Sequence, residues 1–201
     1  MSKPKIFKRI VLGCLAVILL TAAGVVTIRQ QGNFHTVADG KVYRSGQLSE
    51  KQLSKYIEKY RVQSILNLRG RNEKADWWVN EVNLAERLGV SHYDVALSSK
   101  KQPGPEQFQE ILCILQTAPK PLLIHCEAGA DRSGLVSAVY LLEFEGYSYQ
   151  KARRQLSFIY GHIPLLRPKT RAMDQALEEF ETALKLLFEM PAAGAPLPAY
   201  R

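Results

Sequence analysis

The 201-residue sequence is poor in the side chains that hold small domains together through disulfides or metals. It has three cysteines, which lie far apart and in different contexts, and this excludes a disulfide-stapled scaffold. Its four histidines show neither paired helical spacing nor a Cys-x-x-Cys companion. We therefore predict no metal site and no cofactor.

The excess of positive charge belongs largely to the N-terminus. The net charge of +8 includes five Lys or Arg residues and no acidic residue within residues 1–30. The rest of the chain has 22 basic against 19 acidic residues, a net charge of +3. It contains no long run of Lys and Arg, and no zinc-finger or RNA-binding signature. The sequence thus argues against a nucleic-acid partner.

One long apolar run is present, and it lies near the N-terminus. Basic residues within residues 1–9 precede an uncharged run over residues 10–28, which as a helix is long enough to cross a hydrocarbon core of about 30 Å. The apolar part of a signal peptide is shorter, typically about 7–15 residues, so we predict a retained transmembrane anchor and keep cleavage as the alternative. The charge bias predicts a single-pass membrane protein with a cytoplasmic N-terminus and its catalytic domain on the periplasmic or other extracytoplasmic side.

Behind a linker over residues 29–40, strand and helix patterns alternate up to residue 189. Short apolar runs predict strands over residues 41–44, 64–68, 91–96 and 121–125. Periodic segments predict helices over residues 49–60, 77–88, 106–116, 134–142, 148–159 and 169–189. The alternation predicts one α/β domain over residues 41–189, with a central mixed sheet flanked by helices. Residues 190–201, rich in Pro and Ala, are predicted to be a flexible tail.

A loop of small residues follows the last predicted strand and turns directly into a helix. It reads His125-Cys126-Glu127-Ala128-Gly129-Ala130-Asp131-Arg132-Ser133-Gly134. Loop amides and the positive end of the helix converge there on one point, which suits an oxyanion. We predict that this loop binds the phosphate of a substrate, and that Gly129 lets the chain curve without an obstructing side chain. The predicted substrate-binding residues are Glu127, Ala128, Gly129, Ala130 and Arg132.

Three side chains of the loop carry the predicted chemistry. The planar guanidinium of Arg132 can fold over the loop and bind two phosphate oxygens, as a lysine could not. The field that attracts phosphate also stabilises a thiolate, so Cys126 is the predicted nucleophile and forms a phosphocysteine. The Ser133 hydroxyl is placed to donate to the departing thiolate when water breaks that intermediate. His125 is expected to hold the loop backbone, and Cys113, between apolar neighbours, to lie in the core.

The segment His-Cys-x-x-Gly-x-x-Arg-Ser/Thr-Gly, at residues 125–134, resembles the signature of the protein tyrosine/dual-specificity phosphatase superfamily. Two further segments, Val42-Tyr43-Arg44-Ser45-Gly46-Gln47 and Ile65-Leu66-Asn67-Leu68-Arg69-Gly70, are similar to those of its compact, atypical dual-specificity branch. The resemblance covers roughly residues 34–185. It implies a central sheet with flanking helices and a two-step mechanism through a phosphocysteine.

A carboxylate is missing where this family usually has its general acid. The stretch after the strand at residues 91–96 reads Ala-Leu-Ser-Ser-Lys-Lys-Gln-Pro over residues 96–103. We predict Asp131 as the acid, because some superfamily branches, such as the myotubularin-like lipid phosphatases, carry an aspartate at this loop position. Asp76 and Glu106 remain alternatives. In the other interpretation of Asp131, its carboxylate braces the loop by pairing with a basic neighbour.

The variable loop positions hold Glu127, Ala128 and Ala130 rather than lysine, which favours a phosphorylated protein, above all phosphotyrosine, as the substrate. A phosphoinositide or other phospholipid is the second possibility, because basic residues could add anion contacts. These residues are Arg69, Arg71, Lys100 and Lys101. A sulfurtransferase, an arsenate reductase and a catalytically inactive phosphate-binding module remain as rivals. The sequence leaves the oligomeric state open.

Overall fold

The computed structural model describes residues 31–189, together with residues 9, 12, 13 and 15. Its centre is a five-stranded sheet in the order β1-β2-β5-β3-β4. The strands are β1 (His35–Ala38), β2 (Val42–Ser45), β3 (Ser64–Asn67), β4 (Ser91–Asp94) and β5 (Leu122–His125). Only the β1–β2 pair among them is antiparallel, so the predicted mixed sheet is confirmed. β1 lies within the segment that was expected to be a linker.

The helices alternate with the strands as the apolar periodicity predicted. They are α2 (Glu50–Tyr60), α3 (Asp76–Arg87), α4 (Pro105–Thr117), α5 (Asp131–Glu143), α6 (Tyr149–Ala152) and α7 (Arg171–Glu189), with short 3-10 helices η1 (Arg153–Gln155), η2 (Phe158–Tyr160) and η3 (Pro168–Thr170). A capping box at Ser49 begins α2, and the left-handed Arg61 ends it. The single helix predicted over residues 148–159 is wrong, because the backbone leaves the helical conformation at Leu156 and Ser157.

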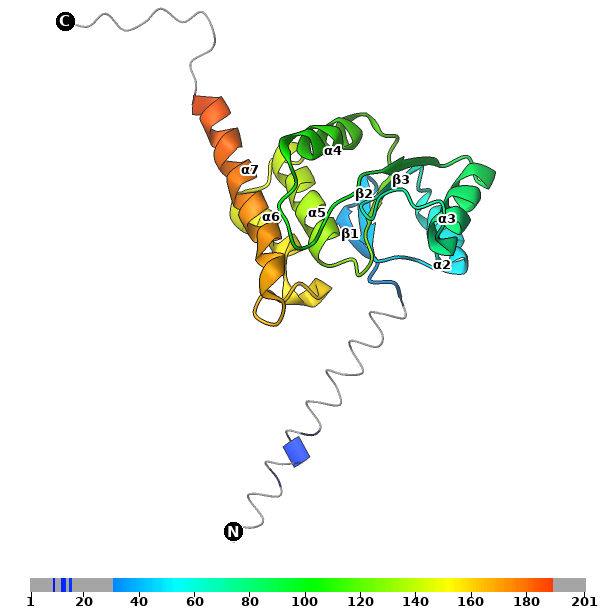
Figure 1. The fold of residues 1–201 in the computed structure, drawn as a ribbon, viewed down its shortest axis with the longest axis horizontal. Helices are drawn as coiled ribbons and strands as arrows, with labels where there is room; N and C mark the ends of the chain where they lie inside the picture. The colour runs from blue at the N-terminus through cyan, green and yellow to red at the C-terminus, as the bar shows by residue number, and fades with distance from the viewer. Residues whose placement is uncertain (1–8, 10–11, 14, 16–30, 190–201) are drawn as a thin grey trace, which may run out of the picture.

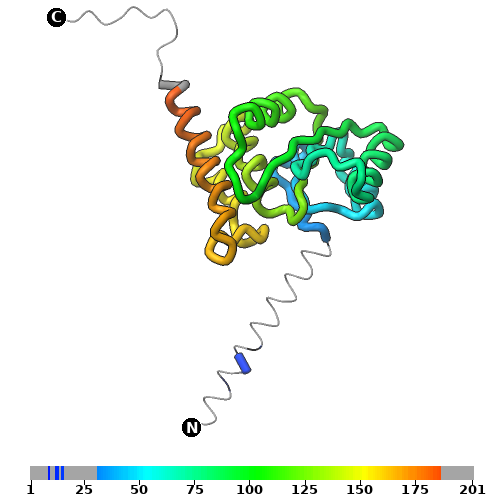
Figure 2. Tube along the Cα trace, in the orientation of Figure 1, coloured from blue at the N-terminus to red at the C-terminus, as the bar shows by residue number. Residues whose placement is uncertain are grey.

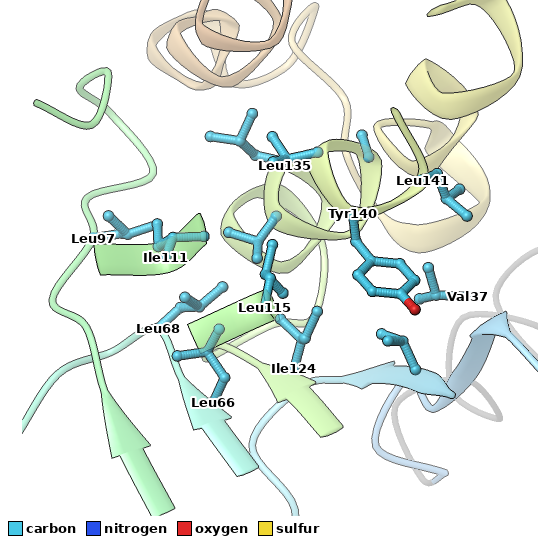
Figure 3. Packing of buried hydrophobic residues seen from close by; sticks show 14 of the residues in the cluster. Val37, Leu66, Leu68, Leu97, Ile111, Leu115, Ile124, Leu135, Tyr140 and Leu141 are labelled. Carbon is cyan, nitrogen blue, oxygen red and sulfur yellow. The ribbon is translucent and has the colours of Figure 1, made fainter. Parts of the chain in front are cut away.

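Alternation along each strand divides the buried side chains between two faces of the sheet. On one face, Ile65 and Leu123 pack with Leu53 of α2 and Leu84 of α3. On the other face, apolar side chains of the strands meet those of α4, α5 and α7. These include Leu66, Ile124, Ile111, Leu115, Leu135 and Met173. Helices therefore cover both faces of the sheet, as Figure 1 shows, and Figure 3 shows the larger of the two clusters from close by.

The structure contradicts the predicted membrane anchor. None of the helices among the described residues is both long and apolar enough to traverse a bilayer. α7, orange in Figure 2, has 19 residues but carries charged side chains such as Asp174, Glu178 and Lys185. Most of residues 10–28 lies outside the described residues. For the described residues the fold class is therefore corrected to a mixed α/β domain without a membrane-spanning helix, and the single-pass topology and extracytoplasmic location that depended on such a helix are corrected as well.

The core position predicted for Cys113 is also wrong. Cys113 is exposed, whereas Ile111, Ile114 and Leu115 are buried. All four residues belong to α4, and a helix buries only the side chains that share its inner face. Apolar neighbours in the sequence therefore did not determine the direction of Cys113.

Candidate active site

The loop predicted to bind phosphate runs from the end of β5 to the first turn of α5. Cys126 follows β5 directly and is 2% exposed. Its Sγ lies 3.5 Å from Oγ of Ser133, which is fully buried on the first turn of α5. The structure thus brings two of the predicted side chains together at the point where β5 and α5 meet.

The carbonyl oxygens from Glu127 to Ala130 all accept hydrogen bonds from residues outside the loop. Gln47 N donates to Glu127 O at 3.0 Å, and Asn33 Nδ2 donates to Ala128 O at 2.9 Å. Arg44 Nη2 donates to Gly129 O at 2.7 Å and to Ala130 O at 2.9 Å. Within residues 31–189, the amides of Glu127, Ala128, Gly129 and Ala130 have no acceptor. The loop therefore turns its carbonyls toward the protein and leaves a row of N–H donors, the arrangement that binds an anion.

Gly129 makes this curvature possible. Its φ is +70°, and a Cβ atom at this position would collide with the backbone of Ser45 and Gly46 at the end of β2. Gly46 also lies close to the loop, because a Cβ there would lie 3.1 Å from Glu127 O. Two glycines therefore allow the loop to lie directly on the end of β2.

Hydrogen bonds to two backbone carbonyls hold one side of the Arg132 guanidinium. Its Nη1 donates to the carbonyls of Leu68, at 3.3 Å, and Leu97, at 3.4 Å. Its Nε is buried and has no partner among the described residues, while Nη2 lies 3.7 Å from a carboxylate oxygen of the exposed Glu127. The Nε and Nη2 edge, which is the edge that binds two oxygens of one anion, is thus the less engaged one.

Asp131 faces a histidine that the sequence analysis did not single out for any role. Oδ1 of Asp131 lies 2.6 Å from Nδ1 of His162, and Oδ2 of Asp174 on α7 lies 2.9 Å from the other ring nitrogen. Burial would lower the pKa of His162, but the hydrogen bonds to these two carboxylates raise it to about 9. An imidazolium therefore joins the start of α5 to α7, which matches the bracing interpretation of Asp131.

Glu81 of α3 forms a buried polar cluster below the loop. One carboxylate oxygen lies 2.9 Å from Nε2 of His125 and 3.0 Å from Nε2 of His92, and the other accepts from Gln47 at 2.7 Å. Burial alone would raise the pKa of Glu81, but the charges and hydrogen bonds of His125 and His92 lower it well below its usual range. The other ring nitrogen of His125 lies 3.4 Å from the carbonyl oxygen of Cys126. This cluster fixes the residue before the predicted nucleophile.

The alternative general acids lie elsewhere. Asp76 and Glu106 are exposed in the first turns of α3 and α4. Asp94 on β4 accepts hydrogen bonds from Asn67 at 2.6 Å and from Trp78 at 3.1 Å. None of these three forms a hydrogen bond or ion pair with Cys126 in the part of the chain that the structure describes.

A basic side chain that was considered for anion binding is held rigidly near the loop. The guanidinium of Arg69 stacks on the ring of Trp77, 3.5 Å from its centroid, and donates to Gln47 at 2.7 Å. Burial lowers the pKa of Arg69, and the charges of Glu127 and Cys126 act on it in the opposite sense. The ring of Trp77 thus supports the guanidinium of Arg69.

Two hollows border the loop. One has a volume of about 410 Å³ and lies between the loop residues Glu127, Ala128 and Ala130 and the segment 158–167. Most of the side chains that the segment contributes are apolar, namely Phe158, Ile159, Tyr160, Ile163 and Leu166, with Arg167. The other hollow, of about 430 Å³, includes Asp131 together with Lys100, Arg167 and Lys169. Within residues 31–189, no group of three His, Cys, Asp or Glu side chains could hold a metal ion.

Sequence reasoning missed several side chains that hold the loop. Glu81 had a detectable signal, because it shares the buried face of α3 with Leu84 and Ala85, where an acidic residue is out of place. Asn33 and His162 had no comparable signal, since each lies in an irregular segment far from the loop in sequence.

Comparison with known proteins agrees with this geometry. A family model described as "Tyrosine phosphatase family" matches residues 20–154, which is more than half of the chain. The chain belongs to this family. Membership in the tyrosine phosphatase family confirms the resemblance inferred from the loop and its two supporting segments.

Relatives within the tyrosine phosphatase family differ in the substrates that their names indicate. Human dual specificity protein phosphatase 8 is 32% identical over 93 residues, which are 38% of this chain and 14% of that protein. Inositol diphosphatase SIW14 of Saccharomyces cerevisiae is 28% identical over 160 residues, which are 73% of this chain and 50% of that protein. The chain thus spans half or less of the length of these relatives.

Solved structures share the fold of this member of the tyrosine phosphatase family. A mutant form of Tk-PTP superposes with a TM-score of 0.58 and 23% identity, over 76% of this chain and 97% of that chain. The core catalytic domain of SIW14, in complex with citrate, gives a TM-score of 0.56 and 23% identity, over 79% and 94%. The predicted sheet flanked by helices is therefore the fold of known phosphatases.

Proposed function

We propose that this phosphatase hydrolyses phosphate esters of phenols, above all phosphotyrosine in proteins, with Cys126 as the nucleophile. The polarity of the loop carries the proposal: the carbonyls from Glu127 to Ala130 are bonded on the outer side, and the amides of the same residues have no acceptor within residues 31–189. Such a row of N–H donors beside a buried cysteine suits a tetrahedral dianion. A buried cysteine that only filled the core would have no use for these N–H donors.

The proposed reaction has two steps. Sγ of Cys126 attacks phosphorus, and the S–P bond forms as the bond from phosphorus to the phenolic oxygen breaks and its electron pair leaves with the phenolate. Nε and Nη2 of Arg132 bind two oxygens of the transferring group. Water then attacks phosphorus, the S–P bond breaks with its electron pair returning to Sγ, and inorganic phosphate leaves with the protons of the water. Ser133 Oγ, 3.5 Å from the sulfur, donates to the released thiolate.

The choice of a phenol rests on the leaving group. Residues 96–103 contain no carboxylate, and the carboxylate of Asp131 is bonded to His162. A phenol, with a pKa of about 10, departs as its anion far more readily than an aliphatic alcohol does. A site with no evident proton donor is therefore suited to phosphotyrosine rather than to phosphoserine or phosphothreonine.

The hollow of about 410 Å³ beside the loop supports an aromatic substrate. Phe158, Tyr160 and Ile163 contribute apolar surface, and Phe158 is 76% exposed. Arg167 is the single Lys or Arg among the residues of that hollow that the structure describes. An apolar surface of this kind gains free energy when it covers an aromatic ring and offers little to a polyanion.

An inositol diphosphate is the second candidate. Its leaving group is a phosphate, which also departs without a proton donor, and the name of the yeast relative SIW14 indicates this activity. The hollow of about 430 Å³ that contains Lys100, Arg167 and Lys169 could take further phosphate groups.

A substrate panel with the full chain tests the proposal. It compares a phosphotyrosine peptide, a phosphoserine peptide, an inositol diphosphate and a phosphatidylinositol phosphate by release of inorganic phosphate. We expect the highest kcat/KM for the phosphotyrosine peptide, no turnover by Cys126→Ser, and full turnover by the control Cys113→Ser, whose cysteine is exposed on α4.

Other outcomes separate the alternatives. Preference for the inositol diphosphate selects the second candidate, and preference for the phosphatidylinositol phosphate selects a lipid phosphatase. Binding of the phosphotyrosine peptide without turnover selects the inactive binding module, and turnover of thiosulfate or arsenate instead of phosphate esters selects the other rivals. Equal hydrolysis by wild type and Cys126→Ser overturns the nucleophile.

A further inference from the structure

Arg44 on β2 is a fully buried cation directly behind the phosphate loop. It is 0% exposed, and its Nη2 donates to the carbonyls of Gly129, at 2.7 Å, and Ala130, at 2.9 Å. Its Nη1 donates to both the backbone oxygen of Gln155, at 2.7 Å, and the side-chain oxygen, at 2.8 Å. The ring of Tyr160 lies 4.2 Å from the guanidinium carbon. The guanidinium thus spans the gap between the loop and η1.

All four oxygens that Arg44 binds are uncharged. Among the described residues, no carboxylate forms an ion pair with it. Arginine is almost never fully buried unless an anion accompanies it, because removing its charge from water costs several kcal/mol. Burial lowers the pKa of Arg44 to about 10, so that it remains protonated at neutral pH. The folded protein therefore contains a buried positive charge that no carboxylate of the described residues pairs with.

The charges of Cys126, Tyr160 and Asp131 counteract the effect of burial on the pKa of Arg44. Burial and, after it, the charge of Arg44 lower the pKa of His35 on β1. Asp131 is already bonded to His162, which in turn is bonded to Asp174. Tyr160 contributes the face of its ring. Cys126 belongs to the loop whose carbonyls Arg44 holds, and its amide donates to Ser45, the next residue on β2, at 3.4 Å. A thiolate at Cys126 and a phosphate in the loop are the anions that can balance this charge.

We infer that Arg44 is a positioning residue of the phosphatase: it turns the carbonyls of Gly129 and Ala130 away from the substrate and supplies the buried charge that the Cys126 thiolate and the bound phosphate neutralise. The inference rests on the proposed function. Arg44 acts from behind the loop through its backbone, whereas Arg132 faces the phosphate itself. Its two roles, geometric and electrostatic, can be tested separately.

Direct substitution tests both roles at once. In the full chain, Arg44→Met removes the positive charge and the guanidinium hydrogen bonds, whereas Arg44→Lys keeps only the charge. Arg87→Met is the control at an exposed arginine of α3. The readouts are the pH dependence of Cys126 alkylation by iodoacetamide, followed on its peptide by mass spectrometry, and inhibition by inorganic phosphate. We expect Arg44→Met to shift the alkylation midpoint to higher pH and to weaken phosphate inhibition at least about tenfold. Because Arg44→Lys keeps a positive charge, its alkylation midpoint and its inhibition by phosphate should lie between those of the wild type and those of Arg44→Met.

Gln155→Glu isolates the electrostatic role without removing the arginine. The new carboxylate replaces an amide oxygen that already accepts from Arg44, so the hydrogen bond is kept and the charge is balanced. We expect a folded protein whose alkylation midpoint lies at higher pH and whose inhibition by phosphate is about tenfold weaker. Gln155→Met, which removes the hydrogen bond without adding charge, should leave the alkylation midpoint nearer that of the wild type.

The outcomes distinguish this inference from the proposed function. If Gln155→Glu folds and changes neither the alkylation profile nor phosphate inhibition, Arg44 has a purely structural role and the inference is overturned. If the wild-type chain neither hydrolyses phosphate esters nor binds inorganic phosphate, the proposed function itself fails. An active wild type with an altered Gln155→Glu profile supports both.

Discussion

Nδ1 of His162 lies 2.6 Å from Oδ1 of Asp131, inside the protein. Because folding raises the pKa of His162 from 6.5 to about 9, its contribution to stability is fully present below pH 6.5 and is lost as the pH rises through 9. We expect the free energy of unfolding to fall by roughly 1–3 kcal/mol over this interval, as the size of the pKa change indicates. Urea unfolding between pH 6 and pH 9.5 measures it. In His162→Gln the decrease should disappear, and persistence of the same decrease would assign it to another group.

The same contact bears on the acid role predicted for Asp131. If Asp131 braces the loop, Asp131→Asn should lower the free energy of unfolding by about 3 kcal/mol, since it leaves a buried imidazolium with one partner fewer. Its loss of kcat should then be similar for aryl phosphates with good and poor leaving groups. A loss that grows steeply as the leaving group becomes more basic would instead identify Asp131 as the general acid. Steady-state kinetics with a series of substituted phenyl phosphates decides between the two.

Gly129→Ala should abolish the activity, because the added Cβ would collide with the backbone of β2. Gly89→Ala is the matched control. Gly89 has a φ of +66°, close to the +70° of Gly129, but a Cβ there would meet nothing within 4 Å. Both variants have the backbone strain of a left-handed alanine, of order 1 kcal/mol, and only Gly129→Ala adds the collision. Equal phosphatase activity in the two would show that the close approach of the loop to Gly46 is unimportant.

Ser133→Ala should slow the second chemical step more than the first. The hydroxyl is 3.5 Å from the sulfur of Cys126 and is placed to stabilise the thiolate as it leaves phosphorus. Loss of one such donor costs about 10²-fold in kcat. Rapid mixing with an aryl phosphate should reveal a burst of phenol followed by slow turnover. Slow turnover without a burst would mean that Ser133 serves the first step instead.

Glu81→Gln tests the buried cluster below the loop. Folding lowers the pKa of Glu81, so the carboxylate stabilises the protein above the ordinary pKa of 4.5, and this contribution is lost as the pH falls below it. We expect the substitution to cost about 3 kcal/mol at pH 7, because His125 and His92 lose a buried charged partner. Thermal unfolding of both proteins at pH 7 and pH 4 should show a difference that becomes smaller in acid. A constant difference would exclude the charge as its cause.

The sequence by itself determined the four parallel strands, most of the helices and the place of the loop. These features are local. The period of the apolar residues predicts the strands and helices, and the run of small residues between Cys126 and Arg132 predicts the loop. Local patterns did not predict which way a single side chain points from its helix. The neighbours of Cys113 are apolar, yet that side chain points outward from α4.

Only the tertiary structure decided what surrounds the loop. The strand order places β2 beside β5, and this brings Arg44 behind Gly129, 85 residues away in the chain, while Asn33 reaches Ala128 and Glu81 reaches His125. Such pairs depend on the packing of several elements at once, and no periodicity in the sequence encodes them. The proposed nucleophile could therefore be predicted from its neighbours in the sequence, but the buried charges around it became visible only when distant segments were brought together.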